Sequence, residues 1–171
     1  YDHVEQGRRQ VGSTFKPFIY ATAIRQKQYS PCMQIPNVLT CIERGSFNLL
    51  EDWCPKNSGD EYGGMVTLKE GLARSLNTVT TSLMKEIGPE AVIKLARDGG
   101  VRSEIPNQPS IALGTVDLSV REVVGSYTAF ANKGVYIEPI AVLRIEDANG
   151  IVLADFQPET REVMSEEDAY V

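Results

Sequence analysis

The chain has 171 residues, of which 42% are hydrophobic and 23% are charged, a composition typical of a single globular domain. The formal net charge is −6 and the longest basic run is Arg8–Arg9, so no nucleic-acid partner is expected. No apolar run approaches the roughly 18 residues that cross a bilayer. The chain opens at Tyr1 without a secretion signal, as expected of a cytosolic protein or of a piece of a longer one.

The first predicted element is a helix from Ser13 to about Gln26, where apolar residues recur on one face. Residues 29–64 are crowded with Pro, Gly, Asn and Ser, so a long and mostly irregular excursion is expected there. A loop of this length in a compact domain is usually functional or cross-linked.

The excursion contains all three cysteines, Cys32, Cys41 and Cys54. A Cys32–Cys41 or a Cys41–Cys54 disulfide is expected if the compartment is oxidising. Free buried thiols are an equally good interpretation. Together with His3 the cysteines form a zinc ligand set on paper, but their spacings lack the paired C-x-x-C of zinc sites, so no metal is predicted.

Three helices are predicted in the middle of the chain. Thr67 and Glu70 fit a capping box that begins one helix, which ends near Ser75. The next runs from about residue 78 to 87, and PEAVIKLARD (89–98) predicts a third, closed by two glycines.

The last third of the chain predicts a helix, a hairpin and the start of another helix. SVREVVGSYTAFANKG has a capping box in Ser119 and Glu122. The pattern then alternates, which predicts strands at about 139–147 and 151–156, joined by a two-residue turn at Asn149–Gly150. SEEDAYV, at the C-terminus, begins a capped helix.

The stretch QVGSTFKPFIYATAIRQ (10–26) is a candidate nucleophile segment. Lys16 follows Ser13 by one helical turn and can reach its hydroxyl; a desolvated lysine loses its proton more readily and acts as a base. The helix N-terminus would stabilise an oxyanion above Ser13. Alternatively, Ser13 is only a helix cap. The S-x-x-K pattern is not specific, since Ser82 and Lys85 also match it.

A second candidate is RSLNT, in which Ser75 and Asn77 lie at a break between two helices. A serine there can relay a proton, and an asparagine amide can bind a substrate carbonyl. The alternative is that Asn77 only caps the following helix. The S-x-N pattern also occurs at Ser46 and Asn48, so it is not specific alone.

Three longer stretches in one order carry a family resemblance. RRQVGSTFKPFIYATAI resembles the nucleophile segment of class A, bifunctional penicillin-binding proteins. EDWCPKNSGDEYGGMVTLKEGLARSLNTV resembles their S-x-N region with its W-x-P-x-N lead-in, and PSIALGTVDLSVREVVGSYTAFANKGVYIEP resembles the segment that follows. The resemblance runs from about Arg8 to Gly150 and identifies the chain as a piece of a D,D-transpeptidase domain.

The resemblance implies a role for each candidate residue. Ser13 would be the nucleophile that is acylated by the D-Ala-D-Ala end of a peptidoglycan stem peptide or by a β-lactam, and Lys16 would be its general base. Ser75 would pass a proton to the leaving amine, and Asn77 would hold the substrate amide. The backbone N–H of Ser13 would form half of the oxyanion hole. No metal or cofactor is implied.

The implied fold is mainly α with a small β-hairpin. It is the helical lobe of the α+β fold that penicillin-binding protein transpeptidases share with serine β-lactamases, with the central sheet largely missing. Residues 1–171 would form one partial transpeptidase domain whose parts are the nucleophile helix (1–28), the cysteine-containing excursion (29–64), a helical subdomain with S-x-N (65–134), and a hairpin with a truncated helix (135–171).

The sequence departs from the family at the third motif, K-[ST]-G, whose strand binds the substrate carboxylate and supplies the second oxyanion N–H. No such triplet occurs, and the nearest string, NKGVY, is predicted to end a helix. The family's strands before the nucleophile, its glycosyltransferase domain and its membrane anchor, which would hold the parent at the periplasmic face of the bacterial membrane, are also missing. We therefore expect this chain alone to be a poor or inactive enzyme that exposes apolar surface and tends to dimerise.

Two other functions stay open on the sequence. A serine β-lactamase shares the S-x-x-K helix but needs a means of activating water for deacylation. A non-catalytic helical interaction module would use residues 29–64 as its docking surface. Labelling by penicillin, and hydrolysis of the bound drug, distinguish these functions.

Overall fold

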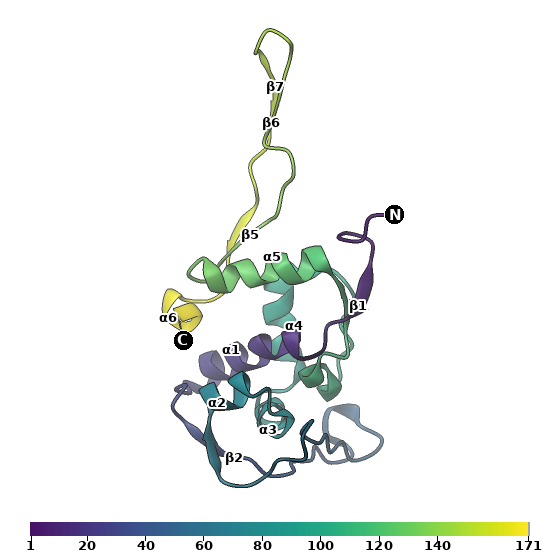
Figure 1. Cartoon of the computed structure of the whole chain (residues 1–171), viewed down its shortest axis with the longest axis vertical. Coiled ribbons are helices and arrows are strands. Elements are labelled where there is room, and N and C mark those ends of the chain that lie inside the picture. The colour runs from purple at the N-terminus through teal and green to yellow at the C-terminus, as the bar shows by residue number, and fades with distance from the viewer. Residues whose placement is uncertain (171) are drawn as a thin grey trace.

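The protein, seen in a computed structural model that describes residues 1–170, is a body of helices with short antiparallel strand pairs (Figure 1). The α-helices are α1 (Lys16–Lys27), α2 (Leu68–Ala73), α3 (Asn77–Ile87), α4 (Pro89–Asp98), α5 (Val120–Ala131) and α6 (Glu166–Tyr170). The strands are β1 (Arg8–Gln10), β2 (Gln34–Pro36), β3 (Met65–Thr67), β4 (Asp117–Ser119), β5 (Val135–Ile137), β6 (Arg144–Glu146), β7 (Val152–Asp155) and β8 (Thr160–Glu162). The 3-10 helices are η1 (Gly12–Phe15), η2 (Ser46–Asn48) and η3 (Pro109–Leu113).

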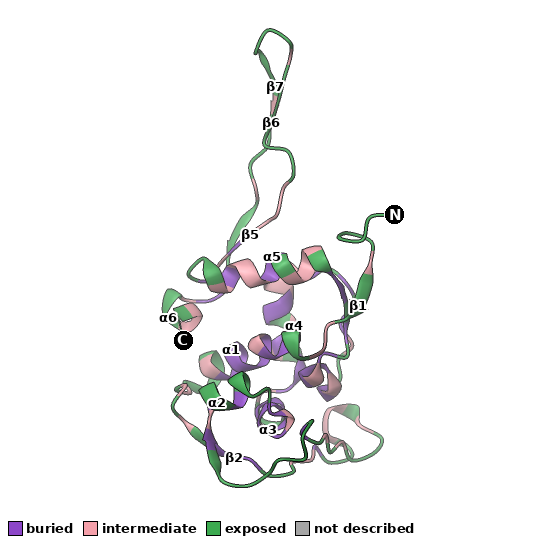
Figure 2. Ribbon diagram, in the orientation of Figure 1, coloured by how far each residue is buried: buried purple, intermediate pink, exposed green. Residues whose placement is uncertain are grey.

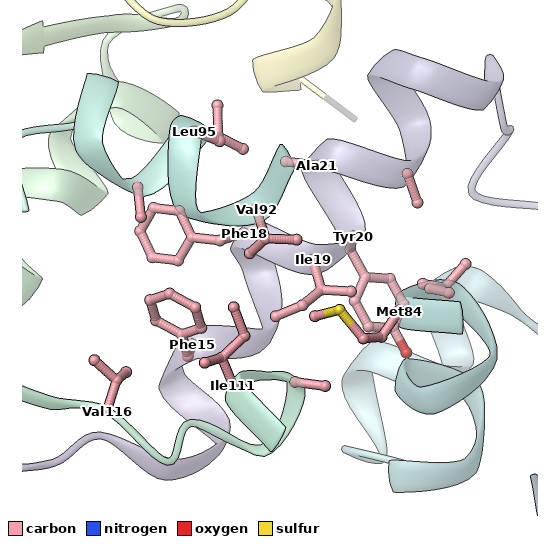
Figure 3. Close-up of a cluster of buried hydrophobic side chains, with 14 of the residues drawn as sticks. Phe15, Phe18, Ile19, Tyr20, Ala21, Met84, Val92, Leu95, Ile111 and Val116 are labelled. Atoms are coloured by element: carbon pink, nitrogen blue, oxygen red, sulfur yellow. The ribbon is translucent and has the colours of Figure 1, made fainter. Parts of the chain in front are cut away.

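The core forms around α1 and the turn before it. Phe15, Phe18 and Ile19 are 1%, 3% and 0% exposed. Figure 3 shows them in one cluster with Met84 of α3 and Val92 of α4. Burying a large apolar side chain contributes roughly 1.5–3 kcal/mol relative to leaving it in water, so this cluster fixes α1 against α3 and α4. No helix of residues 1–170 has the length and apolar character needed to cross a membrane.

The helices that the sequence predicts are confirmed, with shifts at their ends. Helix α5 begins at the predicted capping box, in which Ser119 and Glu122 each bond the other's backbone. The other predicted capping box, of Thr67 and Glu70, forms only one of its two hydrogen bonds. The Thr67 hydroxyl accepts from the Glu70 N–H, but the Glu70 carboxylate accepts from Arg74, one turn further on, instead of reaching back. A charge-assisted bond to an arginine competes successfully with the cap.

The predicted C-terminal hairpin is present as β6 and β7, but the predicted two-residue turn is wrong. The N–H of Asp147 donates to the carbonyl of Ile151 at 2.9 Å, so three residues lie in the loop. Gly150 has a φ of +81°, whereas Asn149 is not left-handed. The Asp147 carboxylate accepts from the N–H groups of Asn149 and Ile151, which stabilises the longer turn.

Three further strand pairs, β1–β4, β2–β3 and β5–β8, are not predicted by the sequence. In the first, Arg8 pairs with Ser119, which brings the segment before Ser13 to the start of α5. Each strand of these pairs is three residues long, too short for an alternating pattern to be recognised. The β6–β7 hairpin projects from the helices, and most of its residues are exposed (Figure 2).

The excursion at residues 29–64 is mostly irregular, as predicted, and contains β2 and η2. It is closed by a disulfide between Cys41 and Cys54, one of the two expected pairings. Cys32 is free and exposed, so the interpretation as free buried thiols is wrong. A β-bridge between Ile42 and Trp53 lies directly inside the disulfide. The disulfide therefore uses two of the three thiols that the hypothetical zinc ligand set would need.

Replacing both bridged cysteines, as Cys41→Ser with Cys54→Ser, is expected to lower the free energy of unfolding by about 3 kcal/mol, since the disulfide closes a loop with a sequence separation of 13. Urea unfolding followed by circular dichroism measures the change. The control Cys32→Ser should stay within about 0.5 kcal/mol of the unsubstituted chain. Equal stability of all three chains would show that other contacts alone hold the excursion.

Candidate active site

Ser13 lies in η1, the 3-10 turn that leads into α1. The predicted α-helical start at Ser13 is therefore one turn too early, since α1 begins at Lys16. The N-cap of η1 is Val11, and no side-chain capping bond is made there, so the interpretation of Ser13 as a helix cap is wrong. Ser13 is exposed while Phe15 and Lys16 are both 1% exposed. The turn is thus anchored by its buried neighbours and presents the hydroxyl to solvent.

Contacts from η3 and α5 hold the turn that contains Ser13 in place. The Gly12 N–H donates to the Gly114 carbonyl at 3.1 Å, and the Tyr127 hydroxyl donates to the Thr14 carbonyl at 2.5 Å. Gly114 has a φ of +72°, and a Cβ there would lie 1.9 Å from the Gly12 oxygen. Only glycine allows this close approach of the two backbones.

Lys16 points away from solvent, toward the turn between α2 and α3. Its Nζ donates to the Ser75 carbonyl at 2.7 Å, to Ser75 Oγ at 2.9 Å and to Asn77 Oδ1 at 2.7 Å. These three acceptors match the three donors of a lysine ammonium group. All three are uncharged, and burial lowers the pKa of Lys16 from 10.5 to about 8.

Ser75 connects Lys16 to Ser13. Its Oγ donates to Ser13 Oγ at 3.0 Å and accepts from Lys16 Nζ. The sequence predicts that Lys16 reaches Ser13 itself, whereas the path in the structure passes through Ser75. Ser75, in the turn that follows α2, has a left-handed conformation with a φ of 54°, which costs roughly 1–2 kcal/mol for a residue with a Cβ. The N–H of Leu76 donates to the Gly71 carbonyl at 2.8 Å and secures this turn.

Asn77 is the first residue of α3, and the N-cap is Leu76, so the interpretation of Asn77 as a helix cap is wrong. Its Oδ1 faces Lys16, and its Nδ2 donates to the carbonyl of Lys56 at 2.7 Å. The sequence does not predict the role of Lys56, because a backbone acceptor has no signature in a sequence. Its only signal is its place in the W-x-P-x-N stretch, at 53–57.

The two accidental motif matches have other contacts. Ser82 Oγ donates to a carbonyl one turn back in α3, and Lys85 pairs with Glu43 of the excursion. Ser46 and Asn48 lie in η2. The structure therefore brings together Ser13, Lys16, Ser75 and Asn77, the four residues that the resemblance selects.

Comparison with known proteins shows the family of the chain. Residues 2–170 match the penicillin binding protein transpeptidase domain family. Penicillin-binding protein 1A of Pseudomonas aeruginosa is 32% identical over 159 residues, which are 92% of this chain and 19% of that protein. Penicillin-binding protein 1A of Aquifex aeolicus is 32% identical over 173 residues, 100% of this chain and 23% of that protein. The chain thus spans less than a quarter of the length of these relatives.

The fold is also that of solved members. The crystal structure of penicillin-binding protein 1A from Haemophilus influenzae has a TM-score of 0.88 and 25% identity, and the match covers 99% of this chain and 29% of that one. PonA1 from Mycobacterium tuberculosis in complex with penicillin V, at 24% identity, has a TM-score of 0.81 over 99% of this chain and 46% of its own. The chain belongs to the penicillin-binding protein transpeptidase domain family, as the three sequence stretches predict.

The buried Lys16 should titrate with a midpoint near pH 8. Between this value and 10.5 the unfolded chain binds more protons at Lys16 than the folded chain, so the contribution of Lys16 to the free energy of unfolding rises with pH across that interval. NMR of lysine labelled with ¹³C at Cε measures the midpoint, and Lys16→Met assigns the signal by removing it. A midpoint above pH 10 would show that the three acceptors outweigh the burial.

Proposed function

We propose that the chain carries the acyl-serine site of a peptidoglycan D,D-transpeptidase, with Ser13 as nucleophile and Lys16 as general base. The observation that carries this proposal is the hydrogen-bonded path from Ser13 Oγ through Ser75 Oγ to Lys16 Nζ, with steps of 3.0 and 2.9 Å. A lysine with a pKa of about 8 is partly neutral near physiological pH, as a general base must be. Family membership supplies the reaction class.

In this proposal the Ser13 proton passes through Ser75 to neutral Lys16 while Ser13 Oγ bonds to the carbonyl carbon of the penultimate D-Ala. Lys16 then returns the proton through Ser75 to the nitrogen of the terminal D-Ala, as the carbon–nitrogen bond breaks. An amine of a second stem peptide attacks the ester, forms the cross-link and gives Ser13 its proton back. With a β-lactam the broken bond is the ring amide, so the leaving nitrogen stays tethered to the acyl group.

Asn77 is proposed to hold the substrate amide. An asparagine amide carries two N–H donors, and one of them donates to the Lys56 carbonyl. The other donor would serve a substrate carbonyl. The Ser13 N–H would contribute half of the oxyanion hole, where preorganised donors stabilise the charge that develops in the transition state.

We further propose that residues 1–171 react slowly by themselves. The sequence contains no K-[ST]-G triplet, and in the family this motif supplies the carboxylate-binding groups and the second oxyanion donor. Loss of one such donor typically lowers the rate by about two to three orders of magnitude.

The proposed setting is the outer face of the bacterial cytoplasmic membrane, with stem peptides and β-lactams as partners and no cofactor. The Cys41–Cys54 disulfide supports this setting, because structural disulfides persist in oxidising compartments.

Intact-mass analysis after incubation with benzylpenicillin tests the proposal. The chain is expected to gain the mass of one penicillin over hours, and Ser13→Ala is expected to gain none. The rate should rise with pH through about 8, because only neutral Lys16 accepts the serine proton. Thr14→Ala, an exposed neighbour whose hydroxyl donates only to the local Val11 carbonyl, is the matched control and should label like the unsubstituted chain.

The outcomes separate the three functions. A stable adduct that Ser13→Ala abolishes supports the transpeptidase site. Rapid release of hydrolysed drug would favour a β-lactamase-like hydrolase instead. An adduct that survives in Ser13→Ala would contradict the assigned nucleophile. Absence of any adduct at millimolar drug would fit both an incomplete site and a non-catalytic interaction module, and the same labelling of a longer chain that includes a K-[ST]-G motif would distinguish these two.

We also propose that the isolated chain dimerises through exposed apolar side chains. Leu143, Ile151 and Leu153 of the hairpin region are 67%, 61% and 64% exposed, and Val124 of α5 is 60% exposed. Sedimentation equilibrium should show a concentration-dependent dimer, which Leu143→Lys with Leu153→Lys weakens by more than Val124→Lys if the hairpin is the contact. A monomer at all concentrations would contradict this proposal.

A further inference from the structure

Three buried polar side chains connect the excursion to the start of α3. Asn37, Asn57 and Thr78 are 2%, 6% and 0% exposed. Asn37 Oδ1 accepts from the Thr78 hydroxyl at 2.7 Å and from Asn57 Nδ2 at 2.9 Å. Asn57 Nδ2 also donates to the Glu61 carbonyl at 2.8 Å. None of these hydrogen bonds joins the three side chains to Ser13 or Lys16.

The network supplies a helix cap that the local sequence lacks. The first N–H groups of a helix need partners from outside the helix, and the N-cap of α3, Leu76, has a side chain that cannot accept. Asn57 Oδ1 accepts from the Thr78 N–H at 3.1 Å, across a sequence separation of 21 residues. The excursion therefore fixes where α3 begins.

The same short segment also sets the orientation of Asn77. Lys56, next to Asn57, presents its carbonyl to Asn77 Nδ2 at 2.7 Å. The Asn77 amide then has its nitrogen toward Lys56 and its oxygen toward Lys16 Nζ, also at 2.7 Å. A rotated amide would place two acceptors, the Lys56 carbonyl and Asn77 Oδ1, against each other.

We propose that Asn57, supported by Asn37, is a positioning residue for Asn77. By capping α3 through Thr78 and by fixing the neighbouring Lys56 carbonyl, it holds the Asn77 amide in the orientation that serves both Lys16 and the substrate. The expected effect on acylation rests on the proposed function. The orientation of the Asn77 amide, by contrast, is a property of the unreacted chain.

The attachment of the excursion does not depend on Asn57 only. The Cys41–Cys54 disulfide and the Ile42–Trp53 bridge close it independently. Loss of the Asn57 side chain should therefore free the Asn77 amide without releasing the whole excursion.

The test compares Asn57→Ala with Thr80→Val. Thr80 is a matched control because it is 0% exposed and lies on α3, and its hydroxyl donates to the carbonyl of Leu76, the N-cap of the same helix, rather than to the excursion. Three measurements are made on each chain: the thermal midpoint, the ¹⁵N order parameter of the Asn77 side-chain amide, and the rate of the benzylpenicillin adduct by intact mass.

We expect Asn57→Ala to lower the Asn77 order parameter from a rigid to a flexible value. Acylation should slow by about tenfold, in line with the loss of a buried hydrogen bond near the reacting groups. Thr80→Val should leave the order parameter unchanged and the acylation rate within about twofold of the unsubstituted chain, even if its thermal midpoint falls as far as that of Asn57→Ala.

A second pair of variants covers the case in which Asn57→Ala does not fold. Thr78→Val removes only the hydroxyl that donates to Asn37 Oδ1, at nearly constant shape, and Thr78→Ser restores it. The inference predicts a mobile Asn77 amide and slower acylation in Thr78→Val and recovery of both in Thr78→Ser.

A rigid Asn77 amide in Asn57→Ala, or equal slowing by Thr80→Val, would overturn the inference and leave Asn57 a purely structural residue. If even the unsubstituted chain forms no adduct, the proposed function fails for this chain. The Asn77 order parameter still decides the positioning role in that case, because it needs no reaction.

Discussion

The buried amino group of Lys16 is the constraint on which the arrangement of the site depends. An amine at 1% exposure has lost its water, so its donors need protein acceptors. These come from Ser75 and Asn77, which are 59 and 61 residues further along the chain. Ser75 places two acceptors, its carbonyl and its Oγ, at this one nitrogen. Its backbone is left-handed there, a conformation that costs free energy for a serine.

The turn between α2 and α3 can approach Lys16 because α2 packs closely on its neighbours. A Cβ at Gly71 would lie 2.9 Å from Val79 Cγ1 and 3.0 Å from the Tyr20 hydroxyl, so only glycine allows this approach. From the other side, the disulfide-closed excursion presents Lys56 and Asn57 to the start of α3. The site is therefore held between a close helix contact and a cross-linked loop, and its exposed members are Ser13 and Ser75.

Local sequence was sufficient where the interactions are local. The Ser119 and Glu122 capping box is made within one turn, and its residue types at that spacing have few other uses. The same reasoning failed at Glu70, where Arg74 offered a stronger partner, and at Asn149, where the Asp147 side chain stabilised a longer turn. In each failure a charged side chain nearby outcompeted the backbone preference, and sequence patterns do not rank such competitors.

The sequence by itself determined the helices, because helix patterns and caps depend on residue type and short spacing. It also determined the family and the four residues of the candidate site, because three long stretches resemble the family in the same order. Only the tertiary structure decided that Lys16 reaches Ser13 through Ser75, that Cys41 pairs with Cys54, and that Asn57 caps α3. The physical reason is that a spacing of three residues places two side chains on one helix face, whereas partners across a fold are chosen by packing. Buried donors and acceptors must all be satisfied together, and that condition extends over the whole chain.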